Sequence, residues 1–265
     1  MMITRSEDYV EYCRETARNL RDVQDLALRG NHKQEITRRI QERILQEIEL
    51  CPEDDMIDIG CGDGTLLQMA QARGLRSAIG LLATEEEAVI VRRLGLQVQQ
   101  GFTDQLPVSD ESASVVVCNN VLLVVPRETI PASLREMYRI ARPGARVFIG
   151  EIPFEPGPAP EPEFESAAAT LAYLYRTHGV RTCLGMLRRM IYWKLTGQPM
   201  IIRGGSTICF YAQPQEFIAM AESAGLHIVR SWAHQDWPGN RYNYLFQKAS
   251  PAAPLNFNRT FSPNA

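Results

Sequence analysis

The chain has 265 residues, of which 45% are hydrophobic and 22% charged, and its formal net charge is −3. This composition is typical of a soluble globular protein, and the length suits one large domain with an insertion better than two domains. The slightly negative charge favours no nucleic-acid partner, and the sequence predicts no transmembrane segment.

The six cysteines are scattered along the sequence without a Cys-x-x-Cys pair. This pattern predicts free thiols in a reducing cytoplasm and no bound metal. Residues 1–21 are charged throughout and lack the apolar core of a signal peptide. We therefore expect a cytoplasmic protein.

Residues 1–50 are predicted to form a helical cap. Apolar side chains recur at helical spacing over residues 20–28 and again over residues 36–48, with a break near Gly30. This periodicity indicates two amphipathic helices. We expect the second helix to lie against an edge of a sheet and the first to cover a functional site.

The next stretch is an apolar run that three alternate glycines interrupt. Residues 56–59 predict a buried parallel strand, and residues 66–73 predict a helix. Between them, Gly60, Gly62 and Gly64 have no β-carbon, so the N–H groups of the turn can face a ligand at the start of the helix. The spacing is not the Gly-x-Gly-x-x-Gly of a dinucleotide-binding turn, which disfavours NAD and FAD.

The rest of the core, up to residue 150, alternates strands with helices. The predicted strands are residues 77–82, 96–101, 113–118 and 146–150, and the predicted helices are residues 84–93 and 132–141. This alternation over residues 51–150 predicts a doubly wound α/β fold built on a mostly parallel sheet. Ligands of such sheets bind outside the carboxyl ends of the strands.

Residues 151–212 interrupt the alternation and are predicted to be a helical insertion, which starts with a proline-rich stretch. Because the insertion leaves the carboxyl end of the fifth strand, we expect it to form a lid on the ligand side. The core resumes over residues 213–249 with a helix and two strands. Their short connection favours an antiparallel last strand in a seven-stranded sheet. Residues 250–265 are predicted to be a flexible tail.

The segment Ile57–Gly64 resembles the first motif of the class I S-adenosylmethionine (SAM) dependent methyltransferases, whose fold is Rossmann-like. Residues 101–107, 113–122 and 139–144 resemble the later motifs of the family, in the same order and spacing. The resemblance implies that SAM is the cofactor. It places these residues around the cofactor: Asp58, Gly60, Cys61, Gly62, Gly64, Leu82, Phe102, Thr103 and Asn119.

In the family, an acidic residue at the end of the second strand binds the ribose hydroxyls. This sequence departs from the pattern, because it has Leu82 at that position. Phe102 and Ser114 also replace acidic residues of the family pattern. Two explanations are open. Either Glu85 or Glu86 reaches the ribose and Phe102 stacks on the adenine, which leaves an active enzyme, or the chain is a non-catalytic binding or partner module with a degraded site. We favour the enzyme, because the glycine turn is intact.

The acceptor side has weaker signals. His234 and Asp236 follow the sixth strand and are either a general base with its orienting carboxylate or part of an ordinary polar loop. Basic and aromatic side chains in the insertion suit an anionic or aromatic acceptor, although a solvated helix face would have the same spacing. The sequence thus predicts methyl transfer to a small molecule that is enclosed by the insertion and the N-terminal helices.

Overall fold

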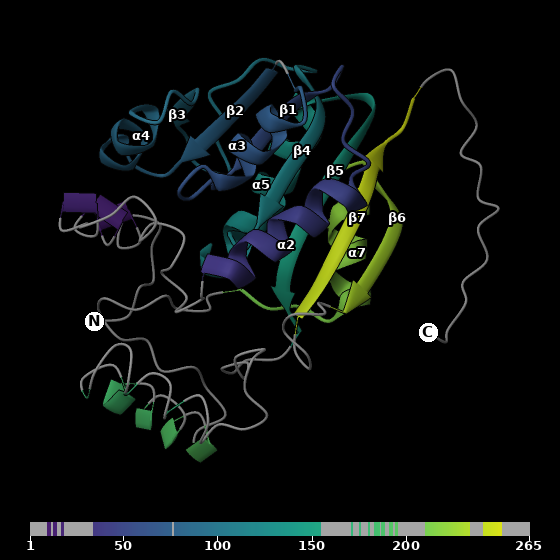
Figure 1. Ribbon diagram of the computed structural model, residues 1–265. Coiled ribbons are helices and arrows are strands. Elements are labelled where there is room, and N and C mark those ends of the chain that lie inside the picture. Colours follow the sequence, from purple (N-terminus) through teal and green to yellow (C-terminus); the bar gives the residue numbers. More distant parts are fainter. Residues whose placement is uncertain are drawn as a thin grey trace.

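In the computed structural model, the described residues are 34–75, 77–154, 210–233 and 241–250, together with single helical positions within 10–18 and 171–195 (Figure 1). The elements, in chain order, are α2 (Gln34–Glu47), β1 (Asp55–Ile59), α3 (Thr65–Ala72), β2 (Ser77–Leu82), α4 (Glu85–Arg92), β3 (Val98–Gln100), β4 (Ala113–Asn119), the 3-10 turns η2 (Leu122–Val124) and η3 (Arg127–Thr129), α5 (Ile130–Ile140), β5 (Ala141–Pro153), α7 (Pro214–Ser223), β6 (Leu226–Ala233) and β7 (Arg241–Lys248).

The seven strands form one sheet in the order β3-β2-β1-β4-β5-β7-β6. Strands β1 to β5 pair in parallel, whereas β7 is antiparallel to both of its neighbours. The predicted seven-stranded, mostly parallel sheet with an antiparallel last strand is therefore confirmed. The carboxyl ends of β1, β2, β3, β4 and β5 meet at one edge, which we call the carboxyl edge.

The sheet is buried on both faces, as its parallel strands require. One face packs against α2, α3 and α4, and the other packs against α5 and α7. Neighbouring residues of β4 show the division, because Val115 and Val117 belong to the first layer and Val116 and Cys118 to the second. Figure 1 shows α2 and α3 crossing the first of these faces.

The opposite edge of the sheet, at the amino ends of the strands, is closed by polar contacts. The guanidinium of Arg146 lies 2.6 Å from the carboxylate of Asp54, which also accepts a hydrogen bond of 2.7 Å from Ser114. The Ser114 hydroxyl in turn accepts a hydrogen bond from the Asp55 amide. Ser114 therefore joins two strands on the side away from the carboxyl edge, and its departure from the family pattern does not concern a ligand there.

The structure differs from the predicted elements at β5. The helix predicted over residues 132–141 ends at Ile140, and the strand predicted over residues 146–150 already begins at Ala141 and skips register with β4 before Arg146. The strand also continues past residue 150, because Ile152 pairs with β7. Most of the predicted cap and lid lies outside the described residues, and so does the predicted tail after residue 250. Among the described helices, none has the length and apolar character to span a bilayer.

Candidate active site

The turn between β1 and α3 has the conformation that its glycines permit. Gly60 and Gly64 have φ angles of 76° and 79°. A β-carbon at Gly60 would lie 2.2 Å from Val121 Cγ2, and one at Gly64 would lie 2.4 Å from Leu96 Cδ1. Both positions therefore require glycine for backbone conformation and for close packing. The turn is fixed against β3 and against the residues that follow β4.

Fewer amides of this turn are open to a ligand than the sequence suggested. The Gly60 and Cys61 amides both donate to Leu81 O, at 2.8 and 3.2 Å, and the Gly64 amide donates to Cys61 O. Among the described residues, only the Gly62 and Asp63 amides of residues 60–65 have no acceptor. A ligand at this turn would therefore meet two N–H groups.

The side chain of Cys61 points away from the open side of the turn. Its Sγ lies 2.5 Å from the place where a β-carbon of Gly80 would be, and the residue is buried in the layer that packs against α3. Gly80 therefore makes room for the thiol. Cys61 can contact a cofactor through its backbone, but the thiol belongs to the core.

Asp58, near the carboxyl end of β1, is 4% exposed. No described residue donates a hydrogen bond to its carboxylate. Burial and the nearby carboxylate of Asp63 raise the pKa of Asp58 to about 7. Two buried acidic groups that have no cationic partner among the described residues suit a positively charged ligand group, which would relieve their repulsion.

Leu82, at the carboxyl end of β2, is buried in the same apolar layer as Ala88 and Val91 of α4. The three glutamates that follow it have other partners. Glu85 pairs with Arg92 at 2.7 Å, Glu86 pairs with Arg14 at 3.0 Å, and Glu87 accepts a hydrogen bond of 2.9 Å from Thr84. Each carboxylate in this stretch thus already has a partner, and none of them stands at the place that Leu82 occupies.

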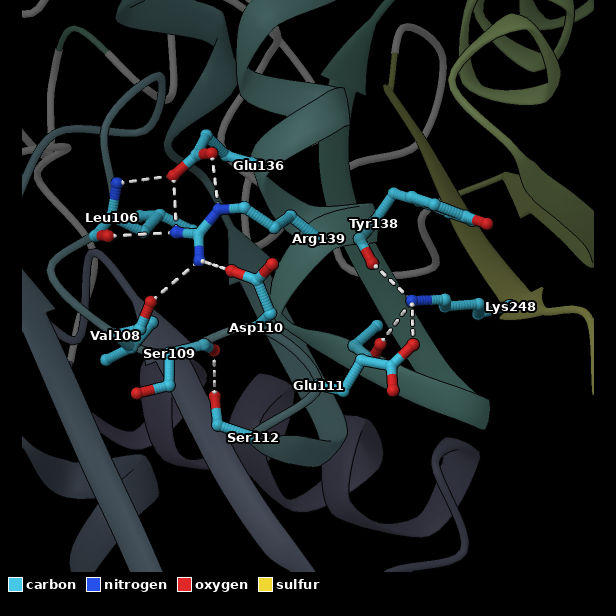
Figure 2. A network of polar contacts seen from close by, with 11 residues as sticks. Leu106, Val108, Ser109, Asp110, Glu111, Ser112, Glu136, Tyr138, Arg139 and Lys248 are labelled. Carbon is cyan, nitrogen blue, oxygen red and sulfur yellow. Dashed lines mark hydrogen bonds and ion pairs between the residues drawn. The ribbon is translucent and has the colours of Figure 1, made fainter.

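The loop after β3 places Phe102 and Thr103 at the carboxyl edge. Phe102 is 36% exposed, and the Thr103 hydroxyl accepts a hydrogen bond of 2.8 Å from Ser133 of α5. Farther along the loop, Arg139 of α5 donates to the carbonyl oxygens of residues 106 and 108 and to two carboxylates (Figure 2). Helix α5 therefore holds the loop that presents Phe102.

A polar network joins the ends of β4 and β5 to the start of β7, and of its members sequence reasoning had placed only Asn119 at the cofactor site. The Arg241 guanidinium lies 2.6 Å from Glu151 and donates to Asn120 at 3.1 Å. Asn119 donates to the other oxygen of Glu151 at 3.0 Å, and the Glu151 amide donates to Asn243 at 2.9 Å. We call these five residues the β4–β5–β7 network.

Two residues of this network have strained backbones, because Asn120 and Glu151 have φ angles of 58° and 62°. Non-glycine residues in this region are uncommon, and they cluster at functional sites. The Oδ1 atom of Asn119 is buried without a hydrogen-bond partner. The signals for this network in the sequence are the two asparagines that end the fourth predicted strand and the glutamate directly after the fifth.

The predicted cofactor residues that the structure brings to the carboxyl edge are Asp58, Gly60, Gly62, Leu82, Phe102, Thr103 and Asn119. The predicted catalytic pair, His234 and Asp236, lies outside the described residues.

Residues 57–149 match a family model that is described as a methyltransferase domain. A curated relative, the malonyl-[acyl-carrier protein] O-methyltransferase of Serratia marcescens, is 29% identical over 118 residues, which are 44% of this chain and 46% of the relative. The chain thus spans less than half the length of this relative.

Two solved structures share the fold. A SAM-dependent methyltransferase of Methanosarcina mazei has a TM-score of 0.55 at 15% identity, over 78% of this chain and 97% of that one. A putative sarcosine dimethylglycine methyltransferase of Galdieria sulphuraria has a TM-score of 0.52 at 11% identity, over 80% of this chain and 85% of that one. At these identities the likeness concerns the fold.

Proposed function

We propose that this chain, in which residues 57–149 are a class I SAM-dependent methyltransferase domain, transfers the methyl group of SAM to a small acceptor. The observation that carries the proposal is the carboxylate of Asp58, which is buried and has no donor among the described residues. The amino-acid part of SAM has an ammonium group and a carboxylate. The ammonium group suits Asp58, and the carboxylate suits the free amides of Gly62 and Asp63.

Bound SAM supplies an activated methyl group on a sulfonium, and the transfer is an in-line displacement. The chain's own residues then have two tasks, which are to hold the cofactor and to align the acceptor with it. Asp58 and the glycine turn do the first at the end of β1. Asn119 is next to Cys118, which pairs with Ile59 of β1, so the β4–β5–β7 network is one strand away from the turn. This network is the proposed acceptor wall.

The chain connections support the same placement of the acceptor. The insertion follows β5, which ends at Pro153, and residues 234–240 lead directly into Arg241. Glu151 is thus at the start of the insertion that we propose to enclose a small acceptor, and Arg241 pairs with it. The curated relative is named for a malonyl group, which is an acid. This name supports an anionic acceptor with a carboxyl group.

The competing reading is a non-catalytic module, and the observation in its favour is Leu82. Without a carboxylate at this place, the binding free energy of SAM should be weaker by about 1.5 to 3 kcal/mol. Isothermal titration with SAM and with S-adenosylhomocysteine (SAH) separates the two readings, with Asp58→Asn as the control. Micromolar binding that the variant loses would support the methyltransferase. Absence of binding by the native chain, together with a copurifying protein partner, would support the module.

The acceptor class can be tested with methyl-labelled SAM. A malonyl thioester, its methyl ester and a neutral thioester of the same length differ only in the group that could be methylated. We expect label in the malonyl thioester alone. Because a carboxylate is already ionised at pH 7, its methylation needs no general base. The variant His234→Ala should then keep most of its activity on the malonyl thioester. If the native chain instead methylates an amine or an alcohol and His234→Ala does not, His234 is the base.

A further inference from the structure

We infer that the cofactor site binds the ribose of SAM without a carboxylate partner and therefore does not distinguish SAM from analogues that lack a ribose hydroxyl. This inference rests on the proposed function and concerns the specificity of the same site. In nucleotide-binding sheets of this type, a carboxylate about 20 residues after the first glycine of the turn accepts the ribose hydroxyls. Leu82, at the end of β2, is at that place in this chain.

The position of the ribose follows from the rest of the site. The turn after β1 holds the amino-acid part, and the β4–β5–β7 network is on one side of it. The nucleoside therefore extends to the other side, across the ends of β2 and β3. A ribose there has two hydroxyl groups that can donate hydrogen bonds, so the question is which acceptors the end of β2 offers them.

The backbone at the end of β2 has no free carbonyl oxygen, because the oxygens of residues 81–84 each accept a hydrogen bond already. Their donors are, in order along the chain, the Gly60 and Cys61 amides, the Gly101 amide, the Gln100 side-chain amide and the Ala88 amide, at 2.8 to 3.2 Å. These bonds close the turn and cap the start of α4. A hydroxyl could share one of these oxygens only as a second, weaker donor.

The side chains at the end of β2 are engaged as well. Leu82 is apolar, and the Thr84 hydroxyl is buried in its contact with Glu87. Both oxygens of Glu85 accept bonds from Arg92, at 2.7 and 2.9 Å, and Glu86 pairs with Arg14. Since the Arg14 contact uses Oε1 of Glu86, no carboxylate of residues 85–87 has both oxygens available to bind a diol.

The surroundings let the ribose hydroxyls keep their water instead. Ala83 is half-buried, and Gln100 and Phe102 are exposed. A hydroxyl that remains hydrated in the complex contributes little to affinity, so its removal costs little. Binding then depends on the two ends of the cofactor, namely the ammonium group at Asp58 and the adenine against Phe102.

The first test uses the native chain and isothermal titration with SAH, 2′-deoxy-SAH and 3′-deoxy-SAH. We expect the three dissociation constants to agree within about threefold. A preference for SAH of about tenfold or more would overturn the inference while leaving the proposed function intact. If none of the three binds, the proposed function fails and the inference fails with it.

The second test installs the missing group. Leu82→Asp should create a preference for SAH over both deoxy analogues of about tenfold or more, and Leu82→Asn is the matched neutral control. Because Leu82 is buried, Ala83→Asp at the neighbouring half-buried position is the second variant. If neither aspartate variant gains the preference, the ribose does not lie at this place. A loss of SAH affinity in Glu86→Gln, without a loss for the deoxy analogues, would also overturn the inference.

Discussion

The carboxylate of Glu151 lies 2.6 Å from the guanidinium of Arg241, and the two side chains are only 3% and 11% exposed. Burying two charges costs a desolvation free energy that their attraction offsets only in part. The φ angle of 62° at Glu151 adds backbone strain. Apolar residues at both positions would avoid this desolvation cost. We therefore interpret the pair as a feature that serves the acceptor rather than stability.

The first prediction concerns this ion pair. Glu151→Gln removes the carboxylate beside the buried Arg241 guanidinium, so the free energy of unfolding should fall by about 3 kcal/mol. The double variant Glu151→Gln with Arg241→Met should lose clearly less free energy of unfolding than the two single variants lose in sum. Urea denaturation measures all three.

The control is the exposed pair of Arg127 and Glu216, whose side chains are 50% and 44% exposed. Glu216→Gln should cost less than about 1 kcal/mol, as is usual for surface pairs. Equal losses for Glu151→Gln and Glu216→Gln would contradict the special role of the buried pair. In titrations with SAH, Glu151→Gln should bind nearly as well as the native chain, because the pair belongs to the acceptor wall.

The second prediction is that Asp58→Asn weakens cofactor binding and stabilises the free protein. Binding should fall about a hundredfold, because a charged hydrogen bond to the ammonium group is lost. The folded protein at pH 8 contains a buried charge that the variant removes. The pKa of Asp58 rises from the ordinary aspartate value of 3.8 to about 7 in the folded protein. This rise corresponds to a gain in the free energy of unfolding of at most about 4 kcal/mol for the variant.

The stability gain has a pH signature. Since the pKa of Asp58 is higher in the folded state, folding takes up a proton between about pH 4 and 7, and the native chain loses this stability as the pH rises to 7. The variant should therefore be more stable than the native chain at pH 8 and nearly equal to it at pH 4. Thermal unfolding at both values measures this, and a gain that is the same at both would contradict it.

The third prediction is the pH dependence of cofactor affinity. An ammonium group beside Asp58 favours the ionised carboxylate, so binding below pH 7 must release the proton that Asp58 holds. The association constant of SAH should be flat above pH 7 and fall about tenfold for each pH unit below it. Titration calorimetry in two buffers of different ionisation enthalpy would detect the released proton. Asp58→Asn should show no such dependence.

The sequence was sufficient for the features that local chemistry determines. The apolar run, the three glycines and the following helix are adjacent in the chain, so their pattern predicts a strand, a turn and a helix start. The β4–β5–β7 network could not be found in this way. Glu151 and Arg241 are brought together by the pairing of β5 with β7, and no local pattern predicts the register of that pairing.

The end of β2 shows the same limit. The sequence places Glu85 and Glu86 one turn into a helix, where either could reach a ribose. Their orientation depends on Arg92 and on Arg14 of the N-terminal segment, which pair with them. Similarly, the expectation that the amides of the glycine turn face a ligand did not include Leu81, whose carbonyl oxygen accepts two of them.

The fourth prediction separates the two reasons for glycine at the turn. Gly60 and Gly95 both have positive φ, at 76° and 79°, but a β-carbon at Gly95 would meet nothing within 4 Å. Gly95→Ala should therefore lower the free energy of unfolding only by the cost of a positive φ angle for alanine, about 1 to 2 kcal/mol. Gly60→Ala adds the clash with Val121 and should cost more. If Val121→Ala does not restore part of this difference in denaturation experiments, the clash is not its cause.

The fifth prediction concerns Arg139, which donates three hydrogen bonds to the loop of residues 102–112 and two to Glu136 of its own helix α5 (Figure 2). Lysine keeps the charge but not the planar set of donors, so it can replace only part of them. Arg139→Lys should lower the free energy of unfolding by about 2 kcal/mol. Arg135→Lys, at an exposed position of the same helix, is the matched control and should change it little.

The loop fixed by Arg139 also presents Phe102, so the same variant should affect the cofactor. We expect faster hydrogen exchange in residues 102–110 and a several-fold weaker affinity for SAH. Arg135→Lys should change neither. Asp58 and the glycine turn are distant in sequence from this loop. A loss of SAH affinity without faster hydrogen exchange in residues 102–110 would therefore mean that Arg139→Lys does not act on the site through the loop. Faster exchange with full affinity would mean that Phe102 does not contact the adenine.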